Sequence, residues 1–432
     1  MSAAGPPQGA NSAPAGGSAA AKPQAWGDHI RAAGPPQGAE HTSAMDKSDV
    51  LIAGAGLVGL ALAAALARSG MTVALLDRAQ PAAAIDLDAW DARVYAISPG
   101  SAAFLARIGA WQSLSCERIE AIESMHIVGD AGATLHFSAY EIGERALAWI
   151  VEERALRAAL VPAVHVPGID VITGAQFASL AWSASEGTLT LDDGRRFSAS
   201  LIVGADGVHS WVRQAAGIVT EPRPYGQQGV VANFDCDLSH HGCARQWFRD
   251  DGSVLAWLPL PGRRISIVWS APNALARELL ALAPDAFAAR VAEAGREALG
   301  ALRMITPPAA YPLSSLRLPT SVAHRMALVG DAAHGVHPLA GQGVNLGFGD
   351  AQALAGVLAE RGPIGDAGAP ILLERFARRR AEPVLAMHTV TDGLVRLFGP
   401  RTPWLRALRN AGLSAVDRLP MIKRALAQPA LR

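Results

Sequence analysis

Residues 50–77, VLIAGAGLVGLALAAALARSGMTVALLD, decide the fold of this chain. The short apolar run Val50–Ala53 predicts a strand. The Ala- and Leu-rich segment Leu57–Ser69 predicts a helix, which stops at Gly70. Met71–Leu76 predicts a second strand, which ends at Asp77. This order of elements is the βαβ opening of a doubly wound α/β fold.

The glycines between the first strand and the helix predict a dinucleotide site. Gly54 permits a tight turn, Gly56 lets the backbone approach a pyrophosphate, and Gly59 allows the helix to pack closely on the strand. Asp77 lies about 20 residues further on, where a carboxylate accepts a hydrogen bond from a ribose hydroxyl. We include its neighbour Arg78 among the predicted cofactor-binding residues. Because an acid disfavours a 2′-phosphate, the predicted adenosine is that of FAD or NAD.

A second glycine-rich stretch, Gly330–Asp350, predicts another ligand-binding turn. It follows the apolar run Met326–Val329 and precedes a helical pattern at roughly 346–360. Free backbone N–H groups at the start of such a helix can hold an anion. A third turn, Gly204–Gly207, also follows an apolar strand, although Asp206 and its glycine alone fit an ordinary turn equally well.

Composition excludes several classes of protein. The chain has 432 residues and a formal net charge of zero, which disfavours a nucleic-acid partner. Its three cysteines fit a reducing compartment rather than a disulfide framework. Cys236, His240, His241 and Cys243 have the wrong spacing for structural zinc, so we predict no metal site. No apolar run reaches the ~18 residues of a membrane span. We expect a cytoplasmic protein, and a peripheral position on the inner membrane stays open.

Three motifs together resemble the class A flavoprotein monooxygenases, the group of para-hydroxybenzoate hydroxylase. They are GxGxxG at Gly54–Gly59, DG at Asp206-Gly207 and GD at Gly330-Asp331. The string HPLAGQGVN at His337–Asn345, followed by Gly347 and Asp350, is similar to the signature of the ubiquinone-biosynthesis hydroxylases. The likeness covers roughly residues 48–400.

The resemblance implies a role for each matching residue. Glycines 54, 56 and 59 would hold the ADP half of FAD, Asp77 the adenosine ribose, and Arg93 the pyrophosphate. Asp206 and Gly207 would touch both the cofactor and the passage of the nicotinamide. The remaining implied cofactor contacts are Gly330, Asp331, Gly341, Gln342, Gly343, Val344 and Asn345. His337 and Pro338 are the candidate catalytic residues on the loop that faces flavin and substrate. His334 and His337 could assist proton transfer, although we favour the alternative that they only pack and hydrogen-bond the loop.

The resemblance also implies the chemistry. Such enzymes reduce FAD with NADH or NADPH, form a flavin C4a-hydroperoxide with O2, and hydroxylate an electron-rich ring. The implied substrate is a polyprenylated phenol of ubiquinone biosynthesis, and a ubiquinone-biosynthesis complex and the membrane surface are implied partners. Three alternatives stay open: a monooxygenase for a soluble aromatic, a non-catalytic flavoprotein of a complex, and a plain NAD dehydrogenase. Glu153 departs from the family, which often has Asn there, and we expect it to turn away or to pair with Arg154 or Arg157.

The expected architecture is a Rossmann-like FAD-binding domain interrupted by an antiparallel β-sheet substrate domain, with C-terminal helices. We assign 48–118, 147–215 and 318–395 to the first domain, and 119–146 and 216–317 to the second. Residues 1–47 are rich in Ala, Gly and Pro, which predicts a disordered tail. The helical C-terminal region is expected to break at its prolines, among them Pro383. Its last part, 396–432, alternates basic and apolar residues, which suits a membrane surface, a partner protein or packing on its own domain.

Overall fold

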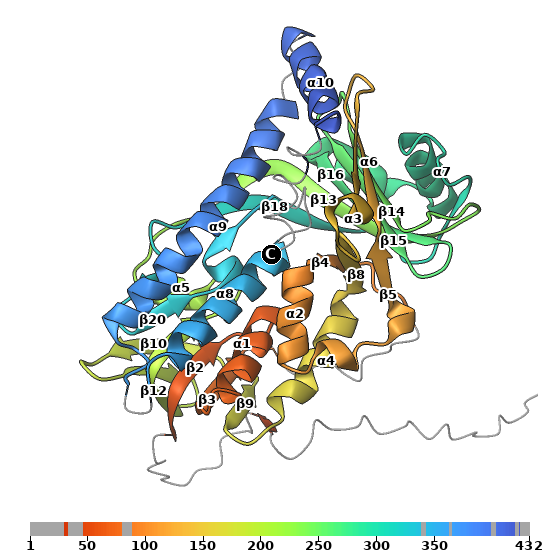
Figure 1. Ribbon diagram of the computed structural model, residues 1–432. Helices are drawn as coiled ribbons and strands as arrows, with labels where there is room; N and C mark the ends of the chain where they lie inside the picture. The colour runs from red at the N-terminus through yellow and green to blue at the C-terminus, as the bar shows by residue number, and fades with distance from the viewer. Residues whose placement is uncertain are drawn as a thin grey trace, which may run out of the picture.

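The computed structural model describes residues 30–32, 46–79, 89–337, 343–362, 365–398, 403–419 and 423. Two large sheets lie side by side, with long helices along the first (Figure 1). Pro338, Gly341 and Gln342, three of the predicted site residues, lie outside the described residues, as does most of the predicted tail at 1–47.

The first sheet is the expected doubly wound unit. Its centre is parallel, with Ile52 of one strand paired to Leu75 on one side and to Val203 on the other. Residues 50–53 are fully buried, as a strand covered on both faces requires. The strand order is β1 (Ile30–Ala32), β9 (Ile169–Thr173), β3 (Val73–Asp77), β2 (Asp46–Ala53), β12 (Arg196–Gly204), β11 (Gly187–Leu191) and β10 (Phe177–Trp182), and β20 (Met326–Leu328) joins β12 and β19 (Val322–Ala323).

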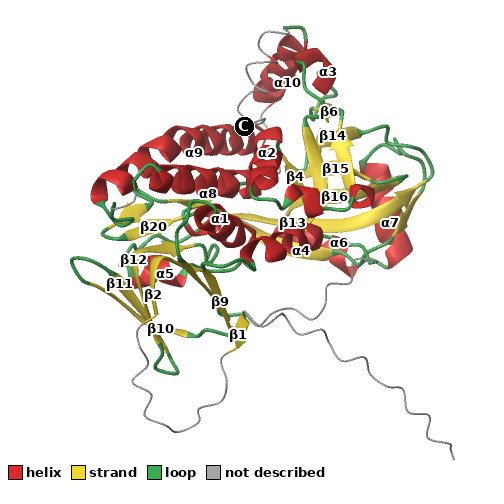
Figure 2. Cartoon of the chain, turned by 60° about the horizontal axis from the view of Figure 1, so that its bottom comes forward, coloured by secondary structure: helices red, strands yellow, loops and turns green. Residues whose placement is uncertain are grey.

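Helices cover one face of this sheet (Figure 2). The helix that follows β2 is buried along almost its whole length, which explains why it is Ala- and Leu-rich without a polar face. The helices on this face are α1 (Leu57–Ala67), α2 (Pro99–Arg107), α4 (Glu153–Val164), α8 (Gly343–Ala359) and α9 (Pro370–Phe398). The other face packs against the β10–β11 hairpin and the short α5 (Trp211–Ala215).

The second sheet is antiparallel apart from one parallel pair, β14–β6. Its order is β21 (His334–Gly335), β18 (Ala309–Arg317), β13 (Arg223–Cys236), β16 (Arg264–Pro272), β15 (Val254–Leu260), β14 (Cys243–Phe248), β6 (Ser124–Val128) and β7 (Thr134–Ser138), with β17 (Leu302–Met304) on β13. Alternate residues such as Phe234, Trp257 and Trp269 pack under α6 (Asn273–Ala281) and α7 (Pro284–Ala294). The opposite face is therefore left for the site.

A small sheet, β4 (Val94–Ile97), β8 (Ala148–Glu152) and β5 (Ile119–Ile122), joins the two halves. The expected fold class is confirmed. The domain boundaries stay a prediction, and two elements cross them: β5 pairs with β8 of the first domain, whereas β21 joins the second sheet. The other short elements are η1 (Trp111–Ser113), η2 (Cys116–Arg118), α3 (Ala139–Ile142), η3 (Gly330–Ala332) and α10 (Pro403–Asp417).

Two expectations were wrong. Ile30–Ala32, placed in the disordered tail, forms strand β1, because the open edge of β9 offers unpaired backbone groups for parallel pairing. Helix α9 does not break at Pro383 but runs through it. Its inner face buries Leu373 and Phe376 in the core shared with α8, and this packing outweighs the one hydrogen bond that proline removes.

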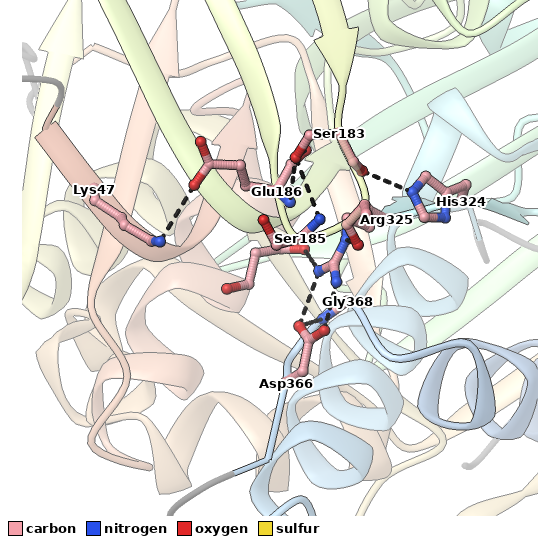
Figure 3. Close-up of polar contacts among 10 residues, drawn as sticks. Lys47, Ser183, Ser185, Glu186, His324, Arg325, Asp366 and Gly368 are labelled. Atoms are coloured by element: carbon pink, nitrogen blue, oxygen red, sulfur yellow. Dashed lines mark hydrogen bonds and ion pairs between the residues drawn. The ribbon is translucent and has the colours of Figure 1, made fainter.

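A clamp around Arg325 holds the segment before α9 against the first sheet (Figure 3). Its guanidinium makes a bidentate pair with Asp366, at 2.9 and 2.6 Å. The same group donates to the carbonyl oxygens of Ala184, at 2.8 Å, and Ser200, at 2.9 Å. One buried arginine thus joins the β10–β11 turn, β12 and the approach to α9, which fixes where α9 starts.

Candidate active site

The first glycine turn is shaped by close backbone contacts. A methyl group on Gly59 would lie 1.9 Å from the carbonyl oxygen of Gly54, and one on Gly54 would lie 2.4 Å from the Ala205 carbonyl oxygen. A methyl group on Gly56, in contrast, would meet nothing within 4 Å. Gly56 is also the N-cap of α1 and gives it no side-chain cap, so the first N–H groups of that helix are open to a ligand.

Asp77 lies at the end of β3 and ties that strand to the same turn. One carboxylate oxygen accepts from the backbone N–H of Ala55 at 2.5 Å, and the other accepts from Ala79 at 2.7 Å. Arg78 is exposed, and its guanidinium lies 6.0 Å from the centre of the Phe177 ring. Asp77 therefore stands beside the glycine turn, whereas Arg78 is engaged on the β10 side.

Glu153 lies between two arginines. Its carboxylate is 3.2 Å from Arg93 and 3.6 Å from Arg157. Arg157 also donates to the carbonyl oxygen of Ala55, at 3.1 Å, so the cluster reaches the glycine turn. The expected pairing with Arg157 is thus present, and the contact with Arg93 was not foreseen. The four-residue spacing of Glu153 and Arg157 on one helix is a sequence signal for this pair.

Arg93 is fixed by rings as well as by charge. Its guanidinium carbon lies 5.4 Å from the centre of the Tyr95 ring and 5.3 Å from that of Tyr311. Tyr311 comes from β18 of the second sheet, so this contact spans the two domains. Sequence reasoning missed both tyrosines, because cation–π partners have no fixed spacing along the chain.

The GD turn is held from behind by the buried Asp350 of α8. Its carboxylate accepts from the backbone N–H of Gly330 at 2.8 Å, from His334 at 2.6 Å and from Arg380 of α9 at 2.6 Å. Burial alone would raise the pKa of Asp350, but these three donors outweigh it and hold that pKa below its usual range. The same contact raises the pKa of His334 against the effect of burial.

Asp331, next in the chain, faces the opposite way and lines the cavity described below. Its side chain is open to that cavity, yet protein surrounds it on the other sides, and this desolvation raises the pKa of its carboxyl. Helix α8 begins at Gly343, and residues 343–345 line the same cavity. The side chain of Asn345 turns away, accepting from Ser98 N–H at 3.0 Å and donating to the Ala96 carbonyl oxygen at 2.8 Å.

The carboxylate of Asp206 caps a helix. One oxygen accepts from the N–H groups of Trp211 and Val212 at the start of α5, at 2.7 and 3.1 Å. Asp206 does not line the cavity, but Gly207 does, with a φ of +82°. Its other carboxylate oxygen is buried without a partner among the described residues. The ordinary-turn interpretation therefore accounts for most of what Asp206 does.

His337 packs against the second sheet. Its Nε2 lies 2.9 Å from Gln227 Oε1, and its ring meets the Tyr225 ring edge-on at 4.8 Å. Tyr225 donates to Asp392 of α9, so the two side chains link β13 to that helix. Burial lowers the pKa of His337 to about 4, which leaves a neutral imidazole at neutral pH. His337 does not line the cavity, which favours a packing role over proton transfer.

These turns open onto one cavity of about 2200 Å³ between the sheets. Ordinary small-molecule pockets have roughly 300–1,000 Å³, so this one has room for a dinucleotide and a second ligand. One wall is polar and glycine-rich, formed by Gly56, Arg93, Glu153, Asp331 and the start of α8. The opposite wall is apolar and comes from the open face of the second sheet and from α9 and α10, with side chains such as Ile127, Val231, Ala256, Leu258, Val268, Met387, Leu394 and Leu413.

Known proteins resemble the chain over most of its length. The family model described as FAD binding domain matches residues 47–390. The ubiquinone hydroxylase UbiL of Rhodospirillum rubrum is 37% identical, over 89% of this chain and 89% of its own. The 3-demethoxyubiquinol 3-hydroxylase of Escherichia coli is 33% identical, over 87% of this chain and 96% of its own.

Solved structures agree on the fold. PqsL of P. aeruginosa has a TM-score of 0.71 at 24% identity, covering 85% of this chain and 99% of its own. The p-nitrophenol 4-monooxygenase PnpA of Pseudomonas putida has a TM-score of 0.72 at 18% identity, covering 90% and 99%. The matched family model, the glycine turns and these relatives together show that the chain is an FAD-dependent hydroxylase, and it belongs to the FAD-binding monooxygenase family that includes the ubiquinone-biosynthesis hydroxylases.

Proposed function

We propose that the chain hydroxylates the aromatic ring of a polyprenylated ubiquinone precursor, with FAD as cofactor. NADH or NADPH supplies two electrons, and O2 supplies the oxygen atom. One oxygen atom enters a ring C–H bond to give C–OH, and the other leaves as water. The observation that supports this most is the cavity, because it joins a glycine-rich wall suited to a dinucleotide with an apolar wall suited to a prenyl chain.

The polar wall fits FAD by two features. The uncapped start of α1 and the empty space beside Gly56 offer N–H groups to a diphosphate, and Arg93 adds a cation at the same wall. The start of α8 offers a second set of N–H groups, which favour a negative charge on the flavin ring. When bound, FAD would supply the chemistry that activates oxygen. We assign glycines 54 and 59 to shaping this wall, and Gly207, Gly330, Asp331, Val344 and the backbone of Asn345 to its cofactor contacts.

The chain's own contribution is to hold the ring and keep water out. The apolar wall orients a hydrophobic substrate, and the buried Asp350 network keeps the GD turn rigid beside it. Two relatives are named ubiquinone hydroxylase and 3-demethoxyubiquinol 3-hydroxylase, and these names support the choice of substrate class. We further propose that the enzyme works in the cytoplasm at the surface of the inner membrane, alongside other proteins of the pathway. Within the part of the chain that is described, no helix is long and apolar enough to cross a bilayer.

Profiling of quinone intermediates in a strain that lacks the gene tests the proposal. We expect a prenylated ring short of one hydroxyl to accumulate, and the wild-type gene to restore the product. A gene carrying Gly56→Ala serves as the matched comparison, because its product should fold but bind FAD more weakly. An unchanged quinone pool would rule out this function and favour a soluble aromatic substrate. Accumulation that the Gly56→Ala gene relieves as fully as the wild-type gene would indicate a non-catalytic role in a complex.

A further inference from the structure

Helix α10 turns its polar side chains inward. Arg409 and Asn410 are buried and bind Asp130, which lies in the turn between β6 and β7. Asn410 donates to the Asp130 carboxylate at 2.7 Å, and Arg409 donates to the carbonyl oxygen of Leu397, at the end of α9, at 2.8 Å. Both views place α10 at an extremity of the molecule beside this hairpin (Figures 1 and 2). The helix is therefore anchored by its polar face.

The outward face of α10 is apolar. Trp404 is 68% exposed, Leu408 61% and Leu419, just past the helix, 48%. Leu408 also lines the cavity, so it lies where the outward face meets the apolar wall. Ala407, Ala411 and Ala415 continue the same exposed stripe. The spacing of Trp404, Leu408, Ala411 and Ala415 is that of one helical face. A surface helix normally shows the reverse arrangement, so this face calls for a covering partner.

Basic side chains border the apolar face. Arg406 is 44% exposed although it lies 3.6 Å from the Asp130 carboxylate, which it shares with Arg409, and Arg418 is also exposed. The neighbouring acids are already engaged: Asp130 is buried against Arg409, and Asp417 accepts from the His136 N–H at 2.9 Å and pairs with Lys423. The border is thus left with a positive charge, which complements an anionic surface.

The same helix lines the cavity from inside. Leu413 and Val416 of α10 form part of the apolar wall, together with Leu394 and Leu397 of α9. The apolar stripe on the surface is therefore continuous, around one helix, with the apolar wall that leads to the glycine turns. A partner protein would not explain why the outside of α10 and the inside of the cavity share this character, whereas a bilayer that holds apolar molecules would.

We propose that the outward face of α10 inserts into the surface of an anionic phospholipid bilayer, with Trp404 and Leu408 in the acyl boundary and Arg406 and Arg418 at the headgroups. This docking deepens the proposed function, because it names the face of the protein that meets the membrane surface. It rests on that function for the identity of the molecule that passes from the bilayer into the cavity. Because the polar face holds the hairpin, α10 docks without unfolding from the body of the enzyme.

Co-sedimentation of the FAD-loaded protein with vesicles tests the proposal. We expect binding to vesicles of phosphatidylglycerol and phosphatidylcholine, and weaker binding to phosphatidylcholine alone. Trp404→Asp should lower the partition coefficient by about tenfold or more, because it removes buried apolar area and adds a repelled charge. Arg418→Glu should weaken binding to the anionic vesicles only.

The matched control is Ile371→Asp at the other end of α9, where the side chain is 57% exposed and distant in sequence from α10. It should bind vesicles like the wild type, and flavin absorbance should be retained in all variants. Equal binding by Trp404→Asp and wild type, or no vesicle binding at all, would overturn the proposal. A wild-type dimer that Trp404→Asp converts to a monomer would also overturn it and assign the face to a second copy. Vesicle binding needs no substrate, so a chain that binds vesicles and hydroxylates no prenylated ring keeps the docking and loses the proposed function.

Discussion

The two walls of the cavity are built by different rules. The polar wall is made of backbone: glycines without clashing side chains, helix starts without caps, and a few charged groups fixed from behind. The apolar wall is made of side chains, contributed one or two at a time by many strands and by α9 and α10. The first therefore tolerates little change and requires exact geometry, whereas the second tolerates change as long as volume and polarity are kept.

The largest effect should come from the support of the polar wall. Asp350→Asn removes the buried charge that Arg380 and His334 share, and breaking a buried ion pair typically costs about 3–5 kcal/mol. We expect the free energy of unfolding in urea to fall by that order, with loss of bound flavin. Glu360→Gln is the control, since that carboxylate pairs with Arg375 and Arg379 on the exposed surface and should leave stability unchanged. Equal losses of stability in both variants would show that the buried ion pairs of Asp350 contribute no more than the exposed ion pairs of Glu360.

The next effect concerns pH and His337, which packs against β13 and does not line the cavity. Burial lowers its pKa to about 4, so the unfolded chain takes up a proton first as pH falls below about 6.5. This group therefore costs stability as pH falls from about 6.5 to about 4, by on the order of 2–3 kcal/mol in total at roughly 1.4 kcal/mol per unit. His337→Gln should remove that part of the slope. The measurement is the free energy of unfolding of both proteins across this range, and parallel curves would contradict a buried neutral imidazole.

A smaller effect separates two glycines of one motif. Gly56→Ala places a methyl group in open space at the polar wall, so the fold should stand while FAD affinity falls about tenfold or more, or ~1.4 kcal/mol. Gly59→Ala drives a methyl group into the Gly54 carbonyl oxygen, so the fold itself should weaken. Urea unfolding of the FAD-free proteins, followed by FAD titration, distinguishes these outcomes. Normal FAD affinity in Gly56→Ala would remove that turn from the cofactor site.

The same contrast explains what could be predicted from the sequence. The turn from Gly54 to Asp77 is local, since the Ala55 N–H and its carboxylate acceptor are 22 residues apart, and one βαβ unit fixes their geometry. Arg157, in contrast, reaches the carbonyl oxygen of Ala55 across 102 residues, and only the fold brings them together. Asp206 shows a different case, because the motif that predicts its ligand contact also supplies the cap of a short helix, and the predicted contact stays a prediction.

The apolar wall was beyond prediction for a related reason. Alternation along a strand shows that two faces exist, but not which face meets α6 and α7 and which meets the cavity. For α10, the basic and apolar pattern was visible, but its inward polar face depends on Asp130, which lies 280 residues before Asn410. A carboxylate in a distant hairpin turn thus decides which side of the helix faces outward.

The smallest effect should be confined to the apolar wall. Val268 of β16 is paired with Val231 and Ala256, and all three line the cavity. Val268→Phe adds volume there without touching the polar wall, so FAD affinity should stay at the wild-type level. The KM for a polyprenylated ring should rise by up to about tenfold, or ~1.4 kcal/mol, which is near the lower end of the effect of a methylene group in an apolar pocket. A fall in FAD affinity with an unchanged KM would contradict the assignment of the polar wall to the cofactor and of the apolar wall to the substrate.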